Sequence, residues 1–300
     1  MKKKFELANL SKNLLYCVCF SICALNLTAC DDDDENGTQG NGPAPIGIPS
    51  SVIDGVRATS MSGVDVTYNE DGTIKEAEVD GNTLVFNYAS SRAIKVDPIR
   101  SLISITSSER ESERWIASDF AFNTSGFVTA YKLKYTDTDP DFREEMNIAY
   151  TFNYNADGQM QKISMKVDGK DDEGSYSESG EINYTYNNKV LEKIEAKSKN
   201  ITCSQTYEYT QAIKNTYNAM PLLLLPEALA SDDCVFNIFA ITGYLGNAGA
   251  NLPTAMTIKN TDLEERYNLS YTLNENKAIS SYTLSGYGET MTFPCDWTNF

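Results

Sequence analysis

The 300-residue sequence contains no histidine. This absence excludes Ser-His-Asp and Cys-His nucleophilic mechanisms, as well as metal sites that depend on imidazole ligands. The glycine-rich loops that hold phosphate groups in nucleotide-binding proteins are also missing. A glycoside hydrolase needs only two carboxylates, but the acidic residues are too numerous for the sequence to nominate a pair. We therefore expect no enzymatic activity and no catalytic residues, with a carboxylate-dependent hydrolase as the less favoured alternative.

Positive charge is scarce. The chain has 25 Lys and Arg residues against 42 Asp and Glu, a formal net charge of −17. Loss of residues 1–29, which are predicted below to be a signal peptide, would remove four lysines and one glutamate and change the net charge from −17 to −20. Nucleic acids are bound through clustered Lys and Arg side chains, so we expect no nucleic-acid partner. Such a charge instead suits a self-repelling surface protein.

Cysteine is scarce outside the N-terminal region, because four of the seven cysteines lie within the first 30 residues. The other three, Cys203, Cys234 and Cys295, are far apart and have no histidine to join them, so a zinc site is not expected. Cys203 lies on the apolar face of a predicted strand and is expected to be a buried thiol. Cys234 and Cys295 are the candidate disulfide pair in an oxidising compartment, and three reduced thiols are the alternative left open.

The first 30 residues have the layout of a secretory signal. Four lysines, at positions 2, 3, 4 and 12, precede a mostly apolar stretch over residues 14–27. The sequence Leu27-Thr28-Ala29-Cys30 resembles the bacterial lipobox, in which the cysteine becomes the lipid-modified first residue. A transmembrane anchor is the alternative, but the stretch is shorter than the roughly 20 apolar residues that a spanning helix needs. We therefore predict a lipoprotein signal peptide over residues 1–29 and lipidation at Cys30.

An acidic run, Asp31 to Glu35, follows the predicted lipid position directly. Such a run can simply be a solvated, disordered charge block. A cysteine followed by acidic residues also resembles the surface-export signal of Bacteroidetes lipoproteins. Residues 36–49 are rich in Gly, Asn, Gln and Pro, which is typical of a flexible tether. Residues 30–50 are thus predicted to anchor the protein, through its lipid, on the outer surface of the outer membrane.

After the tether, apolar and polar residues alternate with a period of two, which predicts antiparallel β-strands. Tyr150, Phe152 and Tyr154, for example, share one face of a predicted strand. These strands end in turns rich in Asn, Asp and Gly, residues that tolerate the positive φ of tight hairpins. Phe122, Tyr154 and Tyr186 stand at matched positions 32 residues apart, each just before such a turn. This weak repeat predicts a meander whose hairpin turns lie along one rim.

One apolar segment, residues 221–246, interrupts the alternation. Within it, Val235, Ile238 and Phe239 lie along one face of a predicted helix that Ser231 and Asp232 could cap. A membrane span is not expected, because polar residues at positions 231–233 interrupt the segment.

The insert helps to choose the architecture. A closed sheet of many more than eight strands leaves an interior too wide for side chains alone to fill, and an apolar insert could fill it. We predict a single all-β domain over residues 51–300, an antiparallel meander forming a soluble barrel-like or strongly curled sheet. Its tyrosine-rich face should point inward and the helical insert should plug it. A transmembrane barrel would leave the insert in a polar lumen. A β-sandwich with a helix at one end is the plain alternative.

The lipobox with its tether, the Tyr-rich Asn-x-Asp-Gly hairpins and the block from Pro221 to Pro253 together resemble a Bacteroidetes surface lipoprotein family. That family is a domain of unknown function with a porin-like fold. The resemblance covers roughly residues 60–295. It implies a barrel-like fold and a surface location, and it carries over no catalytic residues and no cofactor.

Acidic and aromatic clusters supply the remaining candidate sites. Asp137, Asp139 and Asp141 alternate as calcium ligands can, but the segment lacks the glycine and the glutamate of an EF-hand loop. We expect a solvated acidic loop there rather than a metal site, and a hairpin tip at residues 168–174. Trp115 and Trp297 could stack on sugars, although core packing explains their spacing equally well.

The expected role is a surface-tethered module that binds an unidentified glycan, peptide or lipid ligand. Its other partner is the membrane, reached through the N-terminal lipid. A structural protein that associates with other envelope proteins is the alternative. The residues that would contact a ligand cannot be named from the sequence.

Overall fold

The computed structural model describes residues 49–79, 82–88, 99–100, 103–107, 113–139, 142–171, 174–198, 202–220, 234–260 and 263–299. The predicted signal peptide, Cys30, the acidic run and the tether lie outside the described residues. So do Asp141 and the first part of the apolar insert, residues 221–233.

The described chain is almost entirely antiparallel strand. One large sheet is built from β1 (Val56–Met61), β2 (Val64–Tyr68), β3 (Ile74–Val79), β4 (Asn82–Tyr88), β5 (Ile99–Arg100), β6 (Ile103–Ser107), β7 (Glu113–Phe122), β8 (Val128–Asp139), β9 (Phe142–Tyr154), β10 (Met160–Asp171), β11 (Gly174–Asn187), β12 (Val190–Ser198), β13 (Thr202–Glu208), β16 (Ala255–Lys259), β17 (Glu264–Leu273), β18 (Ile279–Gly286) and β19 (Glu289–Asn299). A separate small ladder joins β14 (Ile213–Lys214) to β15 (Asn251–Leu252), and one helix, α3 (Cys234–Ile241), is present in the described part.

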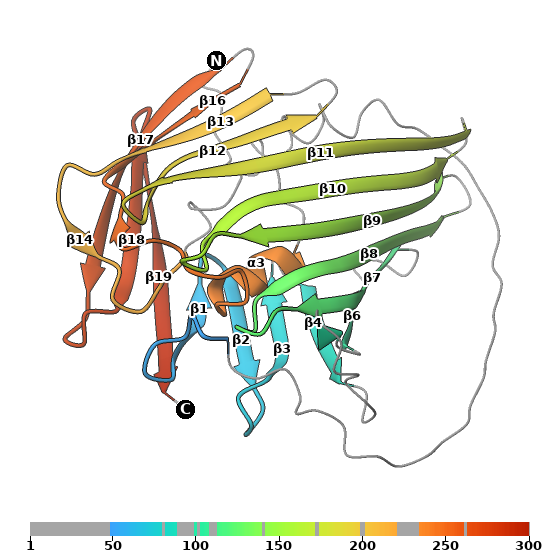
Figure 1. Ribbon diagram of the computed structural model, residues 1–300, viewed down its shortest axis with the longest axis horizontal. Helices are drawn as coiled ribbons and strands as arrows, with labels where there is room; N and C mark the ends of the chain where they lie inside the picture. Colours follow the sequence, from blue (N-terminus) through green and yellow to red (C-terminus); the bar gives the residue numbers. More distant parts are fainter. Residues whose placement is uncertain are drawn as a thin grey trace.

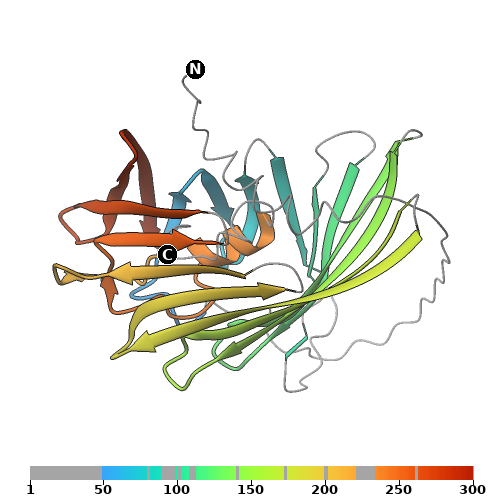
Figure 2. The same ribbon diagram turned by 90° about the horizontal axis from the view of Figure 1, so that it is seen from above.

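The pairing order follows the chain, as in a meander. Each main strand pairs with the next, β4 pairs with β6, and β13 pairs with β16 across the insert. The last strand, β19, pairs with β1, so the ladders return to the first strand. Figures 1 and 2 show the sheet curling round α3, with β8 to β11 as long strands that project to one side. The predicted all-β, plugged, barrel-like fold is confirmed.

Four of the described hairpin turns share one local design. In each, the backbone N–H of an asparagine donates to the carbonyl oxygen four residues later at 2.8 to 2.9 Å, and the fourth residue has a positive φ. The asparagine side chain can accept further backbone N–H groups, which holds the turn closed. This arrangement is found in the turns at residues 69–73, 123–127, 155–159 and 274–278.

The tyrosine-rich face points inward and is dry. Tyr131, Tyr150 and Phe152 are all less than 5% exposed. Phe236 and Phe239 of α3 lie among them, since Phe236 stacks on Phe152 and Phe239 meets Phe120 edge-on at 5.5 Å between ring centroids. The described part of the insert is therefore the plug that the sequence predicted, with Leu245 fully buried behind it.

The outer face is polar and ion-paired. Lysines and arginines on one strand meet carboxylates on the next, in the pairs Lys134–Glu145, Lys162–Glu181, Lys259–Glu264 and Arg266–Glu208. Such a face could not contact the hydrocarbon of a bilayer without a large desolvation cost. Within the described ranges, no helix combines the length and the apolar character that a membrane crossing requires.

Two expectations need correction. Cys295 is a buried free thiol, so this structure does not contain the suggested bond to Cys234, whose side chain is not described. Cys295 lies on the inner face of β19 opposite Met61, and burial raises the pKa of its thiol to about 12. Cys203 is a buried free thiol, as expected. The acidic segment predicted as a loop is strand as far as Asp139, because Asp137 and Asp139 pair with residues of β9.

Candidate functional site

The interior has two differently built halves. Around α3 the packing is dominated by phenylalanine rings, whereas tyrosines line the inner face from β11 to β18. Burial raises the pKa of the phenols of Tyr154, Tyr184 and Tyr207 well above the usual value. These groups therefore stay neutral and add no charge to the core. The described part of the interior is a packed core.

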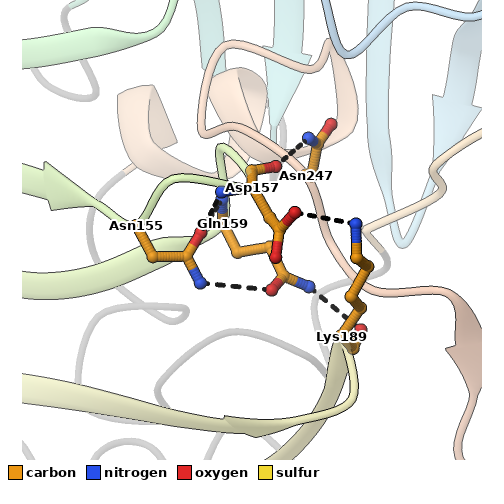
Figure 3. Close-up of polar contacts among 5 residues, drawn as sticks. All are labelled: Asn155, Asp157, Gln159, Lys189 and Asn247. Carbon is orange, nitrogen blue, oxygen red and sulfur yellow. Dashed lines mark hydrogen bonds and ion pairs between the residues drawn. The ribbon is translucent and has the colours of Figure 1, made fainter.

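The rim beside α3 is closed by turns that bind one another (Figure 3). Asp157 in the β9–β10 turn forms an ion pair with Lys189 at 2.7 Å, and its carbonyl oxygen accepts the side-chain N–H of Asn247 at 2.6 Å. Gln159 donates from its side chain to the carbonyl oxygen of Lys189 at 3.0 Å, and Asn155 donates to Gln159 at 3.2 Å. This network ties two hairpins to the loop after the plug. Its hydrogen bonds and ion pair hold these turns against one another, which is a structural role and not a ligand-binding one.

The opposite end carries a hollow on the projecting hairpins. Its volume is about 510 Å³, within the range of small-ligand sites. Three adjacent strands, β9, β10 and β11, supply its lining residues: Glu145, Asn147, Asp168, Gly169, Lys170, Ser175, Tyr176 and Ser177. We refer to this feature as the strand-end hollow.

Strand alternation and register bring these polar side chains together. Asn147 and Asp168 lie between the buried residues of their strands, so they point to the outer face. Across the ladders Asn147 pairs with Asp168, and Asp168 pairs with Ser177. Two residues further along each strand, toward the tips of the projecting hairpins, the same register aligns Glu145 with Lys170 and Lys170 with Ser175. Two cross-strand rows of polar groups thus form the lining.

Each carboxylate of the hollow already has a cation beside it. Asp168 pairs with Lys166 at 2.7 Å and accepts the hydroxyl of Ser177 at 2.7 Å. The hydrogen bond from Lys166, followed by that from Ser177, lowers the pKa of Asp168. Glu145 pairs with Lys134 at 2.7 Å. The hollow is therefore rich in hydrogen-bonding groups but close to neutral.

Tyr176 lies behind the hollow, on the inner face of the sheet, because it alternates with Ser175 and Ser177 along β11 and packs against the core. It pairs with Gly169 across the β10–β11 ladder, and a Cβ atom at Gly169 would lie 2.0 Å from the Tyr176 ring carbon Cζ. Only glycine leaves room for the ring there, so the ring covers the Gly169 backbone.

Of the candidates named from the sequence, only the segment 168–174 contributes to the strand-end hollow in the described part of the chain. The structure describes residues 168–171 and 174 of the expected hairpin tip, as paired strand, and Asp168 there lines the hollow. Asn147, Ser175 and Ser177 were not predicted. Polar residues at alternate positions are normal on the outward face of any strand, so the sequence held no signal that distinguished Asn147, Ser175 and Ser177 as site residues. Trp297 is half-buried and donates its indole N–H to the carbonyl oxygen of Ile279 at 2.7 Å, which fits core packing. The side chains of Trp115, Asp137 and Asp139 are not described. Among the described residues no group of three or more acidic or thiol side chains is arranged to hold a metal.

Comparison with known proteins supports the fold. No family model matches the chain, and no curated protein does. A porin-like protein from Bacteroides vulgatus has a similar structure, with 12% sequence identity, a TM-score of 0.53, and coverage of 80% of this chain and 98% of that chain. A porin-like protein from Bacteroides uniformis is 15% identical with a TM-score of 0.47, over 85% of this chain and 99% of that chain. On the similarity to the Bacteroides vulgatus protein, the chain shares the porin-like fold that the sequence resemblance implied.

Proposed function

We propose that this protein is a lipid-anchored outer-membrane protein that faces the cell exterior, binds a ligand and does not conduct solutes. The observation that carries the proposal is the inverted polarity of a porin-like sheet. A membrane channel needs a polar, open lumen and an apolar outer band. Here the lumen side holds Phe236 and Phe239, each at most 1% exposed, while the outside carries ion pairs.

The lipobox and its acidic run support the membrane attachment. A single acyl chain holds a protein only marginally, whereas the several chains that a lipobox implies hold it durably. A body that needs no hydrocarbon contact can then stand off the membrane on the predicted tether. The strand-end hollow, at the far end of the molecule from the turn network around Asn247, offers the polar surface on which a ligand could dock.

The alternatives are less well supported. A hydrolase acting through two carboxylates needs one carboxylic acid with a raised pKa, and the pKa of Asp168 moves in the opposite direction. A purely structural envelope protein needs a partner surface. In the described part of the chain only four large apolar side chains are exposed, Ile53, Val85, Leu263 and Tyr287, which is few for a partner surface.

Membrane attachment and the lack of conduction can be tested together. In the native cell, a clickable fatty acid should label the wild-type chain and not the Cys30→Ser variant, which should be lost from the membrane fraction. External protease should digest the labelled protein on intact cells. Purified protein added to planar bilayers should give no channel currents, with a general porin as the positive control. Unlabelled wild-type protein, resistance to external protease, or reproducible currents would overturn the proposal.

A further inference from the structure

We infer that two copies of this chain pair with each other as antiparallel strands along the open edge of β11. This edge, residues 175–179 on the side of β12, is called the β11 edge below. The inference goes beyond the proposed function and does not depend on the predicted lipid anchor. It is carried by the backbone groups of Ser175, Ser177 and Ser179, and by the register in which two identical edges fit.

The strand β11 is longer than its neighbour β12. On one side β11 pairs with β10 from Gly174 onward, but on the other side its pairing with β12 begins only at Gly180, opposite Ser198. Figures 1 and 2 show β11 running past the end of β12. Within the described ranges, no other strand pairs with residues 175–179 on that side. The projecting end of β11 is therefore an open sheet edge in the described part of the chain.

The backbone groups that point to the open side belong to the three serines. The β11–β12 turn consists of Asn188 and Lys189, with φ of 48° and 65°, so Asn187 beside it belongs to a hydrogen-bonded pair. Hydrogen-bonding direction alternates along a strand, so the odd-numbered residues of β11 direct their N–H and C=O groups toward the side of β12. In the described part of the chain, the three serines make no hydrogen bond there. Their donors and acceptors are available to another strand.

The β11 edge lacks common features that prevent strand pairing. Natural sheet edges are often protected by proline, by lysine or by a β-bulge. Residues 174–180 contain neither proline nor lysine, and the β10–β11 ladder runs without a bulge. The serine side chains are exposed and small, so a second strand can approach closely. Strand addition gains its affinity from main-chain hydrogen bonds, so it needs no large apolar surface.

The residues of the edge select a second copy in one register. Antiparallel pairing centred on Ser177 sets Ser177 opposite its counterpart and Ser175 opposite Ser179 of the second copy, as a two-fold axis requires. These three pairs exchange about six backbone hydrogen bonds. Each Glu178 then lies opposite Tyr176 of the second copy, whereas a register centred on Glu178 would set two carboxylates opposite each other. The identical chain thus supplies by symmetry a strand of matching length and charge.

The rest of the molecule is compatible with this pairing. Repulsion between two chains of net charge −17 is screened beyond about 8 Å at physiological salt. Ser175 and Ser177 also line the strand-end hollow on the outer face of the sheet. Across the two-fold axis, the hollow of one copy therefore borders the hollow of the other. The dimer places two candidate ligand sites side by side.

Cysteine cross-linking tests the register. Ser177→Cys places two thiols across the two-fold axis, at the Cα separation of about 5.5 Å that a hydrogen-bonded pair has and that a disulfide can span. Ser175→Cys is the matched control, because it puts the same thiol on the same edge but not opposite its counterpart. After mild oxidation, Ser177→Cys should give a disulfide-linked dimer above the wild-type level, and Ser175→Cys should not. The double variant Ser175→Cys/Ser179→Cys should restore the cross-link.

Sedimentation velocity of the full chain, purified in detergent, tests association without a cross-link. At physiological salt the wild-type chain should show a concentration-dependent equilibrium between monomer and dimer. Ser177→Pro removes an N–H that points away from β10, so it should leave that ladder intact and weaken dimerisation at least about tenfold. Ser177→Ala keeps the N–H and should not weaken it. Circular dichroism checks the fold of both variants, and the cysteine variants decide if Ser177→Pro does not fold.

Several results would overturn the inference. These are a monomer at every concentration, a dimer that Ser177→Pro leaves unchanged, or Ser177→Cys and Ser175→Cys behaving alike. Cross-linking of Ser177→Cys in native membranes to a different protein, and not to a second copy, would show that the edge takes a foreign strand. The lipid-labelling, protease and conductance experiments do not involve the β11 edge, so failure of the dimer is distinguishable from failure of the proposed function.

Discussion

At the scale of single residues, the aromatic side chains at strand ends follow one rule. The hydroxyls of Tyr68, Tyr154 and Tyr209 each donate to a backbone carbonyl oxygen of the neighbouring strand at 2.7 Å. The indole of Trp297 makes the equivalent bond to Ile279. Each donor therefore fastens the end of one strand to the start of its neighbour. Tyr184 differs, because its buried hydroxyl has no hydrogen-bond partner among the described residues.

This difference predicts opposite outcomes for two Tyr→Phe substitutions. Tyr154→Phe removes the bond to the Val128 carbonyl oxygen and should lower the free energy of unfolding by about 1 kcal/mol. Tyr184→Phe removes a hydroxyl that is desolvated without compensation, so the free energy of unfolding should stay within about 0.5 kcal/mol or rise. Urea denaturation of both variants checks this. An equal loss in both would show that the Tyr184 hydroxyl has a partner that stabilises the fold.

At the scale of elements, the Asn-headed turns explain both a success and an irregularity of the sequence pattern. Three of them have glycine at the fourth position, Gly72, Gly126 and Gly158, with φ of 79°, 81° and 73°. The turn headed by Asn274 has Lys277 there, with φ of 66°. The same backbone shape is thus imposed on a residue with a Cβ atom, which costs free energy.

Lys277→Gly should therefore stabilise the protein. Glycine adopts the left-handed conformation without the steric cost of a Cβ atom, which should raise the free energy of unfolding by about 1 to 2 kcal/mol. Glycine also has more conformational freedom in the unfolded chain, which offsets part of this, so the net increase should be about 0.5 kcal/mol. The measurement is the free energy of unfolding in urea. Lys277→Ala, which removes the same ammonium group but keeps a Cβ atom, should give no such gain.

Replacing glycine by a residue with a Cβ atom at an equivalent turn should change the stability in the opposite direction, and this serves as the control. Gly158→Ala would place a Cβ atom 2.9 Å from the Phe127 ring at a φ of +73°, so it should destabilise the protein. A neutral Gly158→Ala would show that the turn relaxes, and the argument from backbone strain would fail for Lys277 too.

At the scale of the whole molecule, many tyrosine side chains are buried on the inner face of the sheet with their phenol groups neutral. Burial is the largest cause of a raised pKa for each of Tyr68, Tyr154, Tyr184, Tyr186, Tyr207, Tyr209, Tyr244, Tyr271 and Tyr282. A tyrosinate would be desolvated inside the sheet, so the packed interior requires the protonated form. The free energy of unfolding should consequently fall as the pH rises into the alkaline range.

The sign follows from proton binding. Below pH 10 the phenols are protonated in both the folded and the unfolded state, so these tyrosines leave stability unchanged. Above pH 10 the unfolded chain loses phenol protons first, and each buried tyrosine lowers the free energy of unfolding by up to about 1.4 kcal/mol per pH unit. We expect cooperative unfolding soon above pH 10, with tyrosinate absorbance and circular dichroism changing together. Gradual ionisation with unchanged circular dichroism would contradict a dry tyrosine face.

Much of this protein could be predicted from its sequence, because local rules suffice for it. The period of two in Tyr150, Phe152 and Tyr154 indicated which side chains face inward, and the Asn-x-x-Gly turns marked the hairpins. The apolarity of residues 234–245 indicated a plug, since so many apolar side chains in an otherwise alternating chain must be buried together. The predicted lipidation at Cys30 and the predicted surface location also rest on local sequence alone.

The tertiary structure decided which residues of one face meet. Asn147, Asp168 and Ser177 come from three strands, and their alignment depends on the register of two ladders, which local patterns do not encode. Cys295 came to lie opposite Met61 as a free thiol for the same reason, because β19 pairs with β1 at the other end of the chain. Alternation determines the side of a sheet on which a residue lies, whereas its neighbours across the sheet are set only when the whole ribbon has curled round its plug.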